Sequence, residues 1–430
     1  MYSKNNKIDK LHLFGGDKTI NYQFTKINQI GNEEIKAVNK VMKSGILSDF
    51  IASPGKKMYG GMNILNFEKK ISKFFNVKYA VTFNSWTSGL IASVGSLDLE
   101  PGDEIIVSPW TMSATAMAIL HWNCIPVFAD IEYDTFCIDP NSVLKNISSK
   151  TKAIITVDIF GHSSNIVDLK KICKQHSLKL ITDTAQAPGA KIYNKYAGTI
   201  GDIGGFSLNY HKHIHTGEGG IVVTNNSLLA KRVKFIRNHA ESLVNNSSSK
   251  NLSNMIGHNF RMGEIEAAIG IEQLKKLKKF ISAKNKIGNQ LNKGLKNLDG
   301  LILPTTKFRF THVYYLYPLK LDLKIIKVNK SKIVKALSSE GIQGLIPKYQ
   351  NIHLLPIFQK KIAYGKNHFP WSLKGRKSKV SYKKGICPNA EYLNDKSFFA
   401  IQICLYQLDK NDISLIIKAF KKVWKNINLL

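Results

Sequence analysis

The sequence has no apolar run of the roughly 18 residues that a membrane-spanning helix needs. Its five cysteines are Cys124, Cys137, Cys173, Cys387 and Cys404. They are odd in number, scattered and without a CxxC pair, so we expect reduced, buried thiols and no metal site. The polar start, Met1–Asn6, is not typical of a signal peptide. We therefore expect a cytoplasmic protein without a membrane partner.

Acidic residues are also few: 30 Asp and Glu against 62 Lys and Arg give a formal net charge of +32. Such an excess is typical of proteins that bind nucleic acid or another polyanion. Here the lysines are spread among Asn and Ile, and aromatic residues do not alternate with basic ones to form a stacking platform. We interpret the charge as a composition bias and expect no nucleic-acid partner. A non-catalytic polyanion-binding protein is the alternative.

The length of 430 residues, with 43% hydrophobic content, is enough for two domains with their own cores. Short apolar runs alternate with helical patterns from residue 78 to 224, which favours a mostly parallel α/β sheet. The predicted strands are 79–83, 104–107, 126–129, 153–157, 178–182 and 220–224. Ligands collect at the carboxyl ends of such strands, so the residues that follow each run are the candidates for a site.

The chain becomes helical after residue 225, with helices predicted over 228–238 and over 263–298, the second broken near Phe280. An alternating segment, 312–319, and helices over 330–340 and 412–424 predict a smaller C-terminal α+β domain. We place the domains at 1–275 and 276–430. The basic, patternless segment 364–384 is either a flexible insertion or a mobile loop over a site.

Lys212 is the lysine whose surroundings suggest chemistry, because it lies in a run rich in Gly and His between two apolar segments. An amine with a lowered pKa can attack the aldehyde of pyridoxal phosphate (PLP), which also needs a carboxylate at its ring nitrogen and donors for its phosphate. Asp183 follows a predicted strand and could supply the carboxylate, with Gln186 in reach of the ring oxygen. An ordinary helix cap is the alternative for Asp183.

The segment 84–90 follows another strand and opens a helix, where hydroxyls and free amides suit a phosphate. An ordinary cap is again the alternative. The segment 108–112 follows a third strand and could supply a surface for the face of the ring.

Together these segments resemble the DegT/DnrJ/EryC1/StrS family of sugar aminotransferases, which are fold type I PLP enzymes. The resemblance runs from about residue 30 to the C-terminus and is weakest after residue 299. Its most specific stretch ends in Thr216-Gly217-Glu218-Gly219-Gly220. It implies an α/β fold with a large, mostly parallel, seven-stranded sheet and a smaller C-terminal α+β domain.

The resemblance also implies roles for single residues. Lys212 is the lysine that binds PLP covalently and moves the substrate proton, Asp183 pairs with the ring nitrogen, and Gln186 pairs with the ring hydroxyl. The implied phosphate ligands are Thr87, Ser88 and Ser207. The family's sites lie at a homodimer interface, and Asn259 and Arg261 match the segment that the partner subunit contributes.

Two departures from the family pattern concern the cofactor. The family usually has an aromatic residue on the ring face where this chain has Met112, so either the thioether of Met112 or the neighbouring Trp110 covers the ring. Trp86 stands where a glycine is common, which we expect to narrow the entrance while leaving the phosphate donors in place.

Related dehydratases have His in place of the PLP lysine, so Lys212 favours aminotransfer, and a PLP-dependent dehydratase is the nearest alternative. The neighbouring His211, His213 and His215 are interpreted as structural. The mechanism implied is a transamination in two halves, from an amino acid, glutamate by expectation, to the keto group of a nucleotide-activated deoxysugar or a related cyclitol. The product would be an amino sugar for a surface polysaccharide or glycoconjugate.

Two stretches are candidates for the substrate wall: 44–48, and 347–353 with Lys348, Tyr349 and His353. The second resembles the family stretch in which a Tyr and a His approach the sugar. Ordinary surface loops are the alternative. Lys348 and the basic stretch 374–377 would suit a nucleotide diphosphate.

Overall fold

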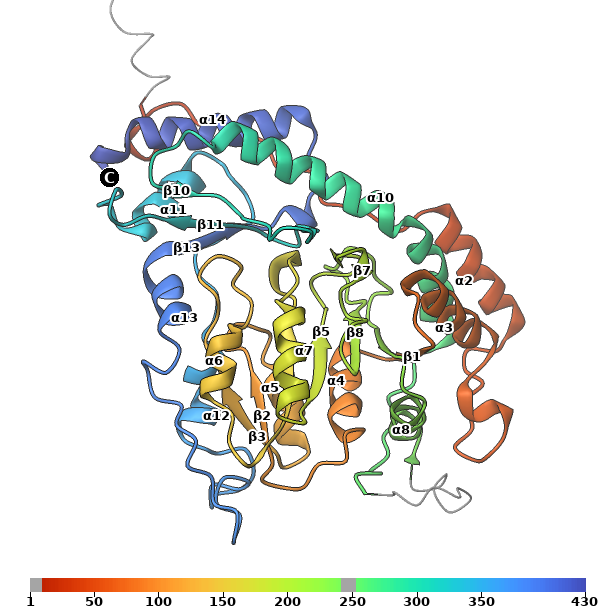
Figure 1. Ribbon diagram of the computed structural model, residues 1–430. Coiled ribbons are helices and arrows are strands. Elements are labelled where there is room, and N and C mark those ends of the chain that lie inside the picture. The colour runs from red at the N-terminus through yellow and green to blue at the C-terminus, as the bar shows by residue number, and fades with distance from the viewer. Residues whose placement is uncertain (1–9, 241–252) are drawn as a thin grey trace, which may run out of the picture.

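The computed structural model describes residues 10–240 and 253–430. Its larger sheet has seven strands in the order β1-β9-β8-β5-β4-β2-β3 (Figure 1). All strands run parallel except β9, which is antiparallel to both of its neighbours. The strands are β1 (Tyr79–Phe83), β2 (Glu104–Val107), β3 (Ile125–Phe128), β4 (Thr151–Val157), β5 (Lys179–Asp183), β8 (Ile203–Ser207) and β9 (Gly220–Thr224). The predicted α/β class with a mostly parallel sheet is confirmed.

Helices cover both faces of this sheet, so its strands are buried on both sides. One face packs against α4 (Trp86–Gly95), α5 (Ala114–His121) and α8 (Ser227–Arg237). The other face packs against α6 (Pro140–Lys145) and α7 (Ile166–Gln175), and, nearer β1, against α3 (Met62–Phe75). A small hairpin, β6 (Lys191–Ile192) and β7 (Lys195–Tyr196), lies outside the sheet.

Of the seven strands of the larger sheet, the sequence patterns missed one, β8, which reads Ile203-Gly204-Gly205-Phe206-Ser207. Two glycines in five residues weaken a strand pattern. Both are needed for close packing: a Cβ atom on Gly204 would lie 2.0 Å from the Thr182 Oγ1 atom, and one on Gly205 would lie 2.1 Å from the Ile221 carbonyl oxygen.

The C-terminal domain is built on an antiparallel sheet in the order β10-β11-β13-β12. Its elements are β10 (Leu301–Ile302), β11 (Tyr317–Leu321), α11 (Lys330–Ser339), β12 (Leu345–Ile346), α12 (Pro356–Gln359), α13 (Pro388–Tyr392), β13 (Phe398–Ile401) and α14 (Lys410–Lys425). The predicted helices of this domain are present. Of the alternating segment 312–319, only the part from Tyr317 onward is a strand.

A single helix, α10 (Glu264–Leu295), connects the two sheets, and α2 (Asn32–Ser44) lies beside its first half. The predicted break near Phe280 is wrong, because α10, which is 32 residues long in all, continues through this position without interruption. Ala267 and Leu274 pack in the core of the large domain, whereas Leu291 and Leu295 pack in that of the small one. The proposed boundary between residues 275 and 276 falls inside this helix.

The small domain lies over the carboxyl ends of the parallel strands (Figure 1). Just beyond β4, the carbonyl oxygens of Phe160 and Gly161 accept hydrogen bonds from the backbone N–H groups of Leu316 and Val313, at 3.2 and 2.8 Å. These contacts close one side of the edge at which a ligand is expected.

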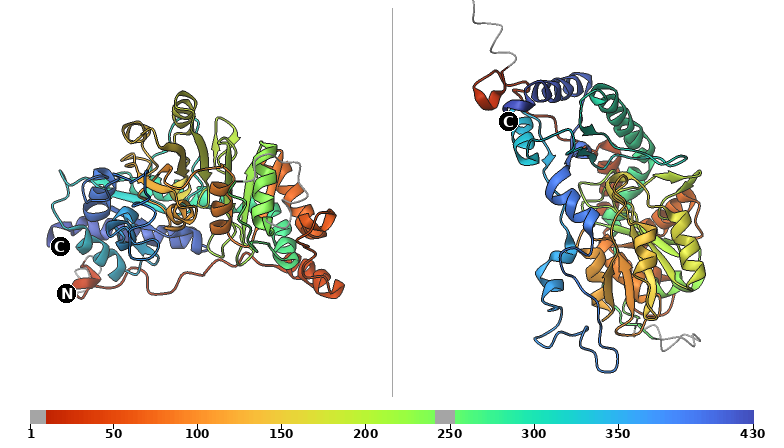
Figure 2. Two further views of the ribbon diagram at one scale, coloured as in Figure 1. Left: turned by 90° about the horizontal axis from the view of Figure 1, so that it is seen from below. Right: turned by 60° about the vertical axis from the view of Figure 1, so that its left-hand side comes forward.

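Apart from its last residue, Lys384, the segment 364–384 lies away from this edge. Arg376 forms an ion pair with Asp103, directly before β2, and the Tyr382 hydroxyl donates to the Pro126 carbonyl oxygen at 2.8 Å. Both contacts lie at the amino ends of the strands, and the segment extends from the end of the molecule opposite the small domain (Figure 2). The stretch 374–377 is therefore not part of the substrate wall.

Within the described ranges, 10–240 and 253–430, no helix has the length and apolar character needed to cross a membrane.

Candidate active site

Lys212 lies in the loop between β8 and β9, at the carboxyl edge of the large sheet. Its side chain is buried with 8% exposed, and its Nζ atom is 4.6 Å from the centre of the Tyr315 ring. Burial lowers the pKa of the amine to about 8, against the opposing effect of Asp183. At physiological pH an amine with this pKa has a much larger neutral fraction than an ordinary lysine, so it is a competent nucleophile and base.

Asp183 ends β5 on the same edge and is 3% exposed. Its Oδ1 atom accepts from the Trp86 Nε1–H at 2.7 Å and the Ala185 N–H at 3.1 Å, and its Oδ2 atom accepts from the Thr115 hydroxyl at 2.8 Å. Burial raises the pKa of this carboxyl, while the donors and Lys212 oppose the shift. An ionised carboxylate has about four acceptor positions, so Oδ2 has room for one more donor.

Gln186 follows in the same loop and links this edge to the small domain. Its Oε1 atom accepts from the Phe160 N–H at 2.9 Å, and its amide nitrogen donates to the Tyr349 hydroxyl at 3.3 Å. The amide therefore lies between the sheet and the predicted substrate stretch.

The candidate phosphate ligands gather at the ends of β1 and β8. Helix α4 begins at Trp86, and Thr87 is exposed in its first turn. The Ser88 hydroxyl donates to Asn84 at 2.7 Å, and the hydroxyl of Ser207, the last residue of β8, accepts from the Asn209 N–H at 3.3 Å. Hydroxyls at a helix N-terminus form a favourable site for an anion.

Trp110 and Met112 differ sharply in exposure. Trp110 is fully buried, donates to Asn351 at 2.7 Å and stacks on Phe136, so its ring is held in the core. Met112 is 64% exposed and lies two residues before α5, next to the buried Thr111, which contacts Thr115. Of the two, Met112 has the freedom to pack on a ring.

Asn259 and Arg261 lie on the surface beside the phosphate segment. The Arg261 Nε–H donates to the Asn259 Oδ1 atom at 2.8 Å, and the carbonyl oxygen of Phe260, between them, accepts from the Asn84 N–H at 2.9 Å. Both side chains are thus oriented by each other.

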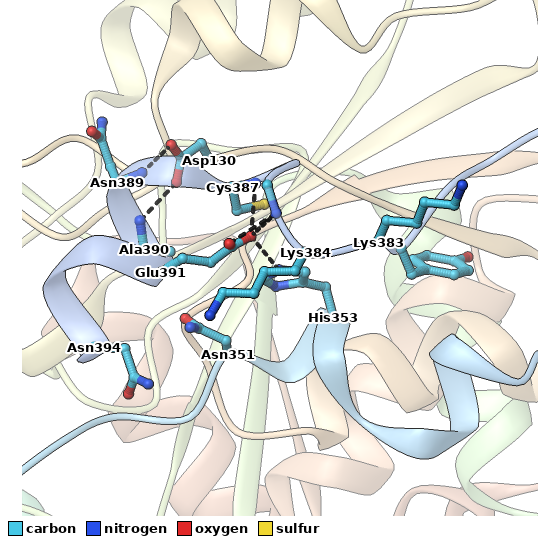
Figure 3. Close-up of polar contacts among 12 residues, drawn as sticks. Asp130, Asn351, His353, Lys383, Lys384, Cys387, Asn389, Ala390, Glu391 and Asn394 are labelled. Carbon is cyan, nitrogen blue, oxygen red and sulfur yellow. Dashed lines mark hydrogen bonds and ion pairs between the residues drawn. The ribbon is translucent and has the colours of Figure 1, made fainter.

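The three substrate candidates are in different environments. Lys348 is exposed and, with Tyr349, lines a pocket of about 440 Å³ that also includes Lys384. His353 is fully buried, and its Nε2 atom is 3.0 Å from the Glu391 carboxylate (Figure 3). His353 therefore contacts a residue of α13 and does not line this pocket.

Three further groups contact the site residues in ways that the sequence patterns did not predict. Tyr315 contacts Lys212, while Thr115 and Trp86 both donate to Asp183. Tyr315 lies in the segment 312–319, whose alternation identified it only as a strand. Thr115 and Trp86 are far from Asp183 in the sequence, so only the fold shows that they meet it.

These groups fit PLP. The site offers a buried amine with a lowered pKa, a carboxylate with a vacant acceptor position, and hydroxyls at a helix N-terminus. They lie along one edge of a doubly wound sheet. Fold and site together define a fold type I PLP-dependent enzyme.

Comparisons with known proteins support this class. The model of the DegT/DnrJ/EryC1/StrS aminotransferase family matches residues 28–382. The spore coat polysaccharide biosynthesis protein SpsC of Bacillus subtilis is 32% identical over 79% of this chain and 86% of its own. The GDP-perosamine synthase of Vibrio cholerae is 31% identical over 76% and 85%.

Among solved structures, Helicobacter pylori PseC, an aminotransferase involved in the biosynthesis of pseudoaminic acid, superposes with a TM-score of 0.76. It is 27% identical, and the match covers 94% of this chain and 99% of PseC. The chain belongs to the DegT/DnrJ/EryC1/StrS family, and it is a PLP-dependent aminotransferase.

We predict that the Lys212 amine of the apoprotein titrates near pH 8 rather than at its ordinary value of 10.5. Because the neutral amine reacts, labelling of Lys212 by acetic anhydride should rise with pH through about 8, as followed by peptide mass spectrometry. Asp183→Asn removes a charge that holds the proton on the amine, so it should move the midpoint lower still. A midpoint near 10.5 would contradict the assignment.

Proposed function

We propose that this enzyme transfers an amino group from an amino acid, glutamate, to the keto carbon of a nucleotide-activated deoxysugar. The observation that carries the proposal is the buried Lys212 amine at the same edge of the sheet as Asp183. Membership of a family of sugar aminotransferases supports the class of substrate.

In each half of the reaction, the chain's own groups bind, orient and move protons. When bound, PLP supplies an electron sink for the charge that develops at the reacting carbon. Asp183 holds the proton on the ring nitrogen, and Gln186 orients the ring hydroxyl. The hydroxyls of Thr87, Ser88 and Ser207 hold the phosphate. Lys212 carries the proton to and from the reacting carbon.

The pocket beside Tyr349 suits the sugar nucleotide. Tyr349 lines it while contacting Gln186, so a ligand there would reach from the cofactor edge to the surface. The pocket is lined by Lys348 and Lys384, which suit a diphosphate, although Lys384 is also paired with Asp395 at 3.2 Å. Two relatives named above make GDP-perosamine or take part in polysaccharide biosynthesis, which supports an amino sugar product for a surface polysaccharide or glycoconjugate.

The alternatives have less support. A dehydratase of this family would have His at the position of Lys212. A non-catalytic polyanion-binding protein would not need a buried amine and carboxylate at the same edge, because burying charged groups costs stability.

We further propose that the active unit is a homodimer. Large apolar side chains are exposed on and around α2 and α3, a pattern typical of protein interfaces. They are Ile35, Met42, Ile46, Leu47, Ile51, Met62 and Leu65. The Leu47 carbonyl oxygen accepts from the N–H of Glu264, which begins α10 three residues after Arg261. A second copy on this surface would therefore cover the segment expected to be shared.

The first test is a visible spectrum of the purified enzyme with PLP, before and after addition of glutamate. We expect a band of covalently bound cofactor that is converted by glutamate to the pyridoxamine form. The Lys212→Ala variant should give neither the band nor the conversion, because it has no amine to form the link. A band unaffected by this substitution would disprove the role of Lys212.

The second prediction concerns the acceptor. Lys384→Gln should raise the KM for a UDP- or GDP-linked 4-keto-6-deoxysugar about tenfold by removing a charge from the diphosphate. Conversion by glutamate alone should not change. Lys383→Gln is the matched control, since this neighbouring side chain points away from the pocket (Figure 3). Equal effects of the two substitutions would exclude the pocket.

The third prediction tests the shared site. Lys212→Ala and Arg261→Ala should each be nearly inactive alone. If Arg261 acts in the partner's site, subunit exchange between equal amounts of the two variants should restore about one quarter of the wild-type sites. Half of the dimers are then mixed, and each mixed dimer has one intact site out of two. A mixture as inactive as its parents would place Arg261 in the site of its own subunit.

A further inference from the structure

Trp86 is the residue that most clearly departs from the family pattern, and it does not narrow the entrance as the sequence suggested. Its side chain is 5% exposed and belongs to the core between α4 and the sheet. The indole Nε1–H donates to the Asp183 Oδ1 atom at 2.7 Å. The indole therefore lies in the core against Asp183, and it does not cover the hydroxyls of the candidate phosphate ligands.

Two glycines leave space for the Trp86 ring. A Cβ atom on Gly89, one turn along α4, would lie 2.8 Å from the Trp86 ring, and one on Gly205 in β8 would lie 2.1 Å from it. Both distances are shorter than van der Waals contact. The ring therefore occupies a recess floored by two glycines, and its orientation toward Asp183 is fixed by packing.

The two Asp183 oxygens are used unequally. Among the residues that the structure describes, Oδ1 accepts from both Trp86 and the Ala185 N–H, whereas Oδ2 accepts from Thr115 alone. Since Trp86 and Ala185 occupy Oδ1, the remaining acceptor position is on Oδ2. This arrangement selects one oxygen for a further donor and fixes the plane of the carboxylate.

We propose that Trp86 is a positioning residue: its indole N–H holds Asp183 ionised and directs Oδ2 toward the ring nitrogen of the cofactor. The inference rests on the proposed pairing of Asp183 with that nitrogen. Without the N–H donor, Asp183 would keep its burial but lose a charge-assisted hydrogen bond, which favours its protonated form.

The consequence is a change in pH dependence. Burial already raises the pKa of Asp183, and the groups that act on it electrostatically include Lys212, Asp158 and Tyr349. Removing the indole donor would raise the pKa of Asp183 further. The ionised carboxylate would then be lost at a higher pH, so cofactor affinity on the acid side should begin to fall at a higher pH than in the wild type.

The test compares Trp86→Phe with Trp122→Phe. Trp122 is equally buried, packs against Gly95 and donates from its Nε1–H to the Ile91 carbonyl oxygen at 2.7 Å, so it loses the same kind of bond away from Asp183. We expect Trp86→Phe to weaken PLP binding to the apoprotein about tenfold and to shift the acid limb to higher pH. Trp122→Phe should do neither.

A second measurement needs no cofactor and no stable variant of Trp86. With ¹⁵N-labelled tryptophan, the wild-type apoprotein should show one indole N–H signal that changes strongly in Asp183→Asn. This signal is assigned to Trp86 by its absence from the spectrum of Trp86→Phe. If that variant does not fold, the assignment rests on the other indole signals, whose shifts should stay unchanged in Asp183→Asn. If no indole signal responds, the contact with Asp183 is disproved.

The outcomes separate this inference from the proposed function. If Asp183→Asn weakens PLP binding but Trp86→Phe behaves like Trp122→Phe, the positioning role is wrong and the pairing stands. If Asp183→Asn also leaves PLP binding unchanged, the pairing itself is wrong.

Discussion

The site depends on keeping two oppositely charged groups, the Lys212 amine and the Asp183 carboxyl, away from water at the same edge of one sheet. Burial lowers the pKa of the amine and raises that of the carboxyl, which favours the neutral form of each group, and their mutual attraction opposes both shifts. The balance leaves an amine that can lose its proton near pH 8 and a carboxyl held in place by three donors. The small domain is part of this balance, because the Tyr315 ring covers the amine.

The two domains therefore cannot be treated as independent bodies. Helix α10 contributes to both cores, so the same rigid element supports the large sheet and the small one. Across the edge, Gln186 contacts the large domain at Phe160 and the small-domain stretch at Tyr349. A displacement of the small domain would therefore change the hydrogen bonds of Gln186, the residue proposed to orient the ring hydroxyl of the cofactor.

Much of this arrangement could be predicted from the sequence, because buried parallel strands are continuous apolar runs and the candidate site residues follow them directly. The failures have physical causes. Strand β8 has glycines where packing leaves no space for side chains, which weakens its pattern. The unbroken course of α10 depends on two cores that meet it at opposite ends. The segment 364–384 has no periodicity, and its position was fixed by single contacts such as that between Arg376 and Asp103.

Residues that act through space were the hardest to foresee. Thr115 and Trp86 are 68 and 97 residues from Asp183 along the chain. Nothing in a local pattern brings them together. The sequence analysis singled out Trp86 but expected it to narrow the entrance, whereas packing against two glycines directs its side chain toward Asp183.

That recess also constrains how the chain can have changed over evolutionary time. Since a methyl group at position 89 would collide with the indole, Gly89 and Trp86 are not independent sites: a lineage carrying alanine at 89 could gain the tryptophan only after, or together with, the loss of that methyl group. Once the indole is in place, the reverse path is closed in the same way. The two positions should therefore be inherited as a pair, and homologues with a small residue at 86 are free of the restriction.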